Sequence, residues 1–87
     1  MYNIIREQYV STKDIFGNSE WSMVSKSLYC DGFRTLKEAK ADLWAAKKQI
    51  ETVRKEFVHY DNKSFTFYDH NYTQDTDTKT VWYIEKV

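Results

Sequence analysis

One regular run of apolar residues constrains the fold of this chain more than any other feature. Between positions 36 and 57 their spacing alternates between three and four, which places them along one stripe of an α-helix. The stripe consists of Leu36, Ala39, Leu43, Ala46, Ile50, Val53 and Phe57. Thr35 and Glu38 have the spacing of a capping box at its start. The sequence therefore predicts a long amphipathic helix over 36–58 that packs one face against another layer.

Segments rich in β-branched and aromatic residues flank this helix at 2–10, 21–30, 65–70 and 80–87. Strict alternation in the second segment would place Trp21, Met23 and Tyr29 on one face and Val24, Leu28 and Cys30 on the other. The connections are short and carry turn formers, which favours hairpins. We expect a single α+β domain over 1–87, of order β-β-α-β-β, with the helix on one face of a four-stranded antiparallel sheet.

Composition narrows the possible functions. Thirteen basic residues balance thirteen acidic ones, which argues against a generally basic nucleic-acid-binding surface. Gly17 and Gly32 are the only glycines, too few for a phosphate-binding loop. Cys30 is the only cysteine, so no intrachain disulfide forms, and we expect it to be a small buried side chain. No catalytic motif is recognisable, and we expect a non-enzymatic protein without a cofactor.

The two histidines are the obvious candidates for metal binding. His59 and His70 lie near four aspartates in the sequence, Asp61, Asp69, Asp75 and Asp77. Their spacing matches no zinc or calcium signature, and we expect surface histidines rather than a metal site. The sequence also has no apolar run long enough to span a membrane and no signal-peptide pattern at its start. We therefore expect a cytoplasmic protein that does not associate with membranes.

The aromatic content is the most suggestive functional feature. The chain has seven Tyr, five Phe and three Trp, more large rings than a small core accommodates. Because one helix covers only one sheet face, we expect surplus rings on the open face and at the loop tips. Aromatic residues are enriched at the centres of protein interfaces. The sequence predicts a protein-binding surface made of Phe16, Trp21, Tyr68, Tyr72 and Trp82.

Two alternatives from other classes remain. The helix carries a mild basic excess, and a nucleic-acid-binding face would use Lys40, Lys47, Lys48 and Arg54, with binding that weakens steeply with salt. A small-ligand-binding protein with an aromatic pocket would need a concavity of about 300 Å³. A homodimer through the uncovered sheet face or an edge strand is compatible with each function.

The stretch Asp31–Ala41, DGFRTLKEAKA, lies between two strand pairs, and the chain closes on Trp82–Val87, WYIEKV. In this arrangement the chain resembles small accessory proteins of bacteriophages and mobile elements, over its whole length. The resemblance implies a phage-encoded inhibitor that binds and blocks a host defence protein, such as a CRISPR-Cas component, in the host cytoplasm. It assigns no functional residues.

Overall fold

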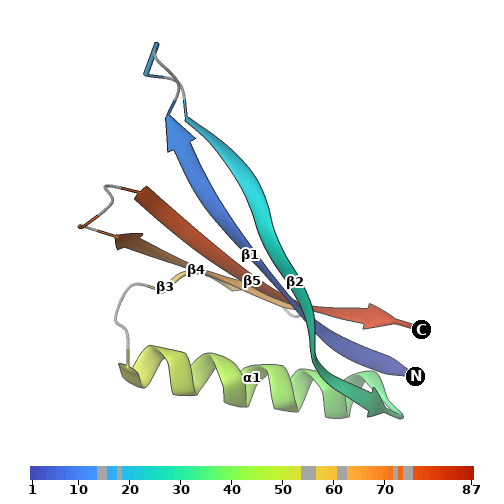
Figure 1. The fold of residues 1–87 in the computed structure, drawn as a ribbon. Coiled ribbons are helices and arrows are strands. Elements are labelled where there is room, and N and C mark those ends of the chain that lie inside the picture. Colours follow the sequence, from blue (N-terminus) through green and yellow to red (C-terminus); the bar gives the residue numbers. More distant parts are fainter. Residues whose placement is uncertain (14–15, 18, 54–56, 61–62, 72, 74–75) are drawn as a thin grey trace.

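A computed structural model describes residues 1–13, 16–17, 19–53, 57–60, 63–71, 73 and 76–87. Along these residues the elements are β1 (Tyr2–Lys13), β2 (Ser19–Phe33), α1 (Leu36–Val53), β3 (Phe57–Tyr60), β4 (Ser64–Asn71) and β5 (Thr76–Lys86). The α1 helix lies along one face of a twisted antiparallel sheet (Figure 1). The predicted α+β fold is confirmed, as are its four strands and the order of those strands around the helix.

The strands pair in the order β2-β1-β5-β4-β3, and every neighbouring pair is antiparallel. Two hairpins, β1–β2 and β4–β5, are joined by the pairing of β1 with β5. This joint brings the chain ends together, and the Val87 amide donates to the Met1 carbonyl at 2.9 Å. The long strand β2 is therefore one edge of the sheet, and the short strand β3 is the other.

The short strand β3 lies where the sequence predicted the end of the helix. Described helical structure ends at Val53, and residues 57 and 58 belong to the strand rather than to the helix. Phe57 fits both periodicities, because it continues the helical stripe and also opens an FVHY segment rich in strand-forming residues. Its pairing with Phe67 of β4 extends the sheet by one strand.

The helix begins as its capping motif indicates. The Glu38 amide donates to the Thr35 hydroxyl oxygen at 3.2 Å, which satisfies one of the amides at the helix start. Gly32 precedes it with a φ of +80°, a left-handed conformation that favours glycine. Phe33 then packs against the core and anchors the chain as it enters the helix.

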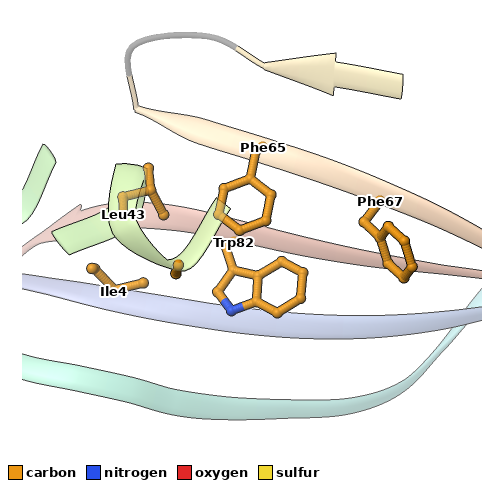
Figure 2. Packing of buried hydrophobic residues seen from close by; sticks show 6 residues of the cluster. Ile4, Leu43, Phe65, Phe67 and Trp82 are labelled. Atoms are coloured by element: carbon orange, nitrogen blue, oxygen red, sulfur yellow. The ribbon is translucent and has the colours of Figure 1, made fainter. Parts of the chain in front are cut away.

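The core lies between α1 and the central strands (Figure 2). Its buried residues are Ile4 of β1, Leu43 and Ala46 of α1, Phe65 and Phe67 of β4, and Trp82 of β5, and Ala39 of α1 is also fully buried. The Phe65 and Trp82 rings, which are partners in the β4–β5 pairing, stack with centroids 4.6 Å apart and planes at 14°. The small side chains of Ala39 and Ala46 let the helix approach this aromatic layer closely.

The predicted position of Trp82 on the open face is wrong. Its side chain is only 7% exposed and belongs to the core. Partners across antiparallel strands share a face, so Trp82 lies on the same side as Phe65, toward α1. Its neighbours Val81 and Tyr83 alternate to the opposite face.

A pair of leucine substitutions tests this one-sided core. Leu43 is 1% exposed, and Leu43→Ala should cost about 2–5 kcal/mol of unfolding free energy because it leaves a cavity under the helix. Leu28 is 53% exposed, and Leu28→Ala should cost about 0.5 kcal/mol or less. Urea unfolding followed by circular dichroism measures both, and equal losses would contradict the assigned core.

Candidate functional site

The sheet face opposite α1 is the candidate site. The registers place Trp21, Met23 and Leu28 of β2 opposite Ser11, Tyr9 and Ile5 of β1. The same β1 residues lie opposite Asp77, Lys79 and Tyr83 of β5. Because paired residues share a face, these side chains form rows across the sheet on the side away from α1. Within these rows Ile5 is buried, at 6% exposed. No described element covers this face, and β1 and β2 diverge from the helix toward the turn that joins them (Figure 1).

Irregular pairing changes which β2 residues share this face. Register shifts between β1 and β2 leave Val24 and Tyr29 between consecutive pairs. Each extra residue resets the alternation of the strand. Leu28 therefore joins Trp21 and Met23 on one face, whereas strict alternation predicted that it would lie on the other.

Large apolar side chains are exposed along β2. Met23 and Leu28 are each 53% exposed, and Trp21 is 37% exposed. Val24 and Tyr29, at the irregularities, are also exposed. We call Trp21, Met23, Val24, Leu28 and Tyr29 the β2 surface. Several large apolar side chains exposed along one strand are a feature of interaction sites.

Side chains from all four long strands meet at one end of this face. The Trp21 and Tyr68 rings make an edge-to-face contact with centroids 6.0 Å apart. The Lys79 ammonium lies 4.8 Å from the centroids of both the Tyr9 and the Trp21 rings. Such cation–π contacts and aromatic pairs hold the rings in place. The structure therefore brings together Trp21 and Tyr68, two of the predicted binding residues.

A cleft of about 270 Å³ opens beside these rings, and it is lined by Trp21, Tyr68, Asp69, His70 and Asp77. The His70 Nδ1 and Asp77 Oδ1 atoms are 2.6 Å apart. The Asp77 side chain remains 57% exposed beside this contact. The cleft thus combines aromatic walls with polar groups at the rim of the β2 surface.

A hydrogen-bonded carboxylate lies further along the same face. The Tyr9 hydroxyl donates to Glu7 Oε2 at 2.7 Å. This bond lowers the pKa of Glu7 below its ordinary value of 4.5; partial burial opposes the shift, and Tyr83 and Lys26 add to it. The Tyr9 ring is therefore held by Glu7 at its hydroxyl and by Lys79 over its face.

The remaining predicted binding residues have different positions. Phe16 lies in the turn after β1 and is 82% exposed, while Tyr72 lies outside the described residues. The predicted binding surface did not include Tyr9, Met23, Leu28 or Lys79. Alternation within β1 and β5 indicates that Tyr9 shares a face with Glu7 and that Lys79 shares one with Tyr83, but only the pairing of these strands brings them together.

The structure does not place all the predicted basic residues of the helix on one solvated face. The Lys47 side chain is 11% exposed and pairs with Glu51 at 3.0 Å, and its ammonium lies 4.4 Å from the Trp44 ring centroid. Lys47 is therefore not part of a solvated basic surface, because its stem packs on the helix and its charge is paired. Lys48 is exposed and lies 5.5 Å from the same ring, Lys40 is half-buried, and Arg54 lies outside the described residues.

Among the residues that the structure describes, no three His, Cys, Asp or Glu side chains are grouped closely enough to hold a metal ion. The Cys30 thiol is half-buried on β2. None of the helices in the described ranges combines the length and apolar character needed to cross a membrane.

Comparison with known proteins adds no relative. The sequence matches no family model, and neither a curated protein nor a solved structure is detectably similar to it.

The Glu7–Tyr9 bond gives a prediction about pH. Because the folded-state pKa of Glu7 is lowered, its carboxylate stabilises the fold above pH 4.5, and this stability is lost as pH falls through the lowered pKa. Tyr9→Phe should raise the pKa of Glu7 toward 4.5 and reduce the acid-dependent loss of stability. Carboxyl ¹³C NMR titration measures the pKa. Tyr29→Phe, at an exposed position on β2, is the control, and an unchanged Glu7 titration in Tyr9→Phe would contradict the assigned bond.

Proposed function

We propose that this chain is a non-enzymatic protein-binding module that contacts its partner through the β2 surface, with Phe16 and the Trp21–Tyr68 pair at one end. The observation that carries the proposal is the exposure of several large apolar side chains along one edge strand. A small domain gains stability by burying such groups, so their exposure is costly unless a partner covers them.

The residue types on this surface are those that dominate protein interfaces. Trp, Tyr and Met are enriched there because they provide large contact areas at moderate entropic cost. Trp21 and Tyr68 are already ordered by their mutual contact and by Lys79, which reduces the cost of ordering them on binding.

The side chains of this surface, rather than the backbone edge of β2, are the contact that we favour. Addition of a partner strand needs a regular edge. The irregularities at Val24 and Tyr29 interrupt the regular pairing of β2, and bulges are a common protection of edge strands against such pairing. A partner that packs over the face would meet Trp21, Met23 and Leu28 together.

A phage-encoded inhibitor of a host defence protein, such as a CRISPR-Cas component, is the specific form of this proposal. It is supported by the resemblance carried by residues 31–41 and by the exposed apolar side chains of the β2 surface. Inhibition of this kind requires only tight binding and no chemistry by the bound module.

Capture of partners by matched tryptophan variants tests the proposal. Three chains are tagged: the wild type, the double variant Trp21→Ala with Met23→Ala, and Trp44→Ala. Each is incubated with bacterial lysate, both with and without prior nuclease treatment. Trp44 is 41% exposed but lies on the helix, so its variant removes a similar ring from a different surface. We expect wild type and Trp44→Ala to retain the same protein in stoichiometric amount. The double variant should retain at least tenfold less of that protein.

Mass spectrometry identifies the retained protein, and circular dichroism establishes that each variant is folded. Equal retention by the double variant, or a loss confined to Trp44→Ala, would overturn the assigned surface. Retention that requires intact nucleic acid would instead favour the lysines of α1.

A further inference from the structure

A second cleft lies on the helix side of the sheet, away from the β2 surface. Its volume is about 350 Å³, within the lower range of small-molecule sites. Ile50 of α1, Phe67 of β4 and Trp82 of β5 supply apolar walls. Arg6 of β1 and Gln49 of α1 bring polar groups to the same space. The cleft therefore continues the core toward solvent and adds a cationic side chain at its margin.

Two buried donors at this cleft have no acceptor among the described residues. They are the Arg6 Nε atom and the Trp82 Nε1 atom. Arg6 and Trp82 face each other in the β1–β5 register. Figure 2 shows the indole nitrogen of Trp82 on the side of the ring that points toward β1, the strand that carries Arg6. Buried donors are almost always satisfied, and leaving one unpaired is costly, especially on a charged group.

We propose that this cleft binds a small organic carboxylate with an apolar body. Both unsatisfied groups are donors and one belongs to a cation, so the complementary ligand group is an anionic acceptor. The apolar walls at Ile50 and Phe67 favour an aliphatic or aromatic body over a fully hydrated inorganic anion. This site is independent of the protein-binding proposal, because it lies on the opposite side of the sheet and uses none of the β2 surface.

Titration with matched acids and amides tests the site. The probes are phenylacetate and hexanoate, and the controls are phenylacetamide and hexanamide, which keep the shape but lose the charge. The readout is the indole N–H resonance of Trp82 in ¹⁵N-labelled protein, assigned with Trp21→Phe and Trp44→Phe. We expect at least one acid to shift this resonance in a saturable way, and its amide to bind at least tenfold more weakly.

The variant Arg6→Met keeps an apolar stem and removes the guanidinium. We expect it to bind the acid at least tenfold more weakly while unfolding at or above the wild-type temperature, because a buried N–H donor without an acceptor has been removed. Arg34→Met, at an exposed arginine before α1, is the control and should bind like wild type. Equal binding of acid and amide, wild-type affinity in Arg6→Met, or no shift with either acid would overturn the proposal.

Discussion

The stacked pair of Phe65 and Trp82 is the contact on which the rest of the structure depends. The two rings lie on neighbouring strands, 4.6 Å apart, and Leu43 and Ala46 of the helix belong to the same buried cluster. Ile4 brings β1 into the same layer, so this cluster joins both hairpins to the helix. A small domain has few residues to bury, and here the aromatic layer concentrates apolar area where one helix can cover it.

Because the core is built on one face, the opposite face is left to other interactions. Polar pairs such as Tyr9 with Glu7, and the stacking of Lys79 on Tyr9 and Trp21, order side chains there without a covering layer. The β2 surface follows from the same constraint, since the helix does not reach that side of the sheet. The Arg6–Trp82 cleft arises where the core meets solvent at its margin. The β2 surface and the Arg6–Trp82 cleft thus have a common origin, because a single helix covers only one face of the sheet.

The sequence predicted the elements better than the surfaces. The helix was predictable because its apolar stripe repeats at fixed spacing and Thr35 caps its start. Phe57 fits both helical and strand periodicity and was misassigned. Alternation indicates which residues share a face but not which face the helix covers. The sequence therefore did not show whether Trp82 or Tyr83 faces the helix. The irregularities at Val24 and Tyr29 have no signal in a single sequence, and they decide where Leu28 lies. The Trp21–Lys79 contact depends on the pairing of the first and last strands, which local pattern does not specify.

In the free chain the Met23 and Leu28 side chains of the β2 surface are open to solvent, whereas Leu43 is buried under the helix. Solvent paramagnetic relaxation of methyl groups, measured with a soluble gadolinium chelate, distinguishes these two environments. We expect the Leu28 and Met23 methyls to relax strongly at every protein concentration and the Leu43 methyls to stay protected. Equal protection of Leu28 and Leu43 in dilute solution would contradict the open β2 surface, because it would mean that the face assigned to a partner is already covered within the chain.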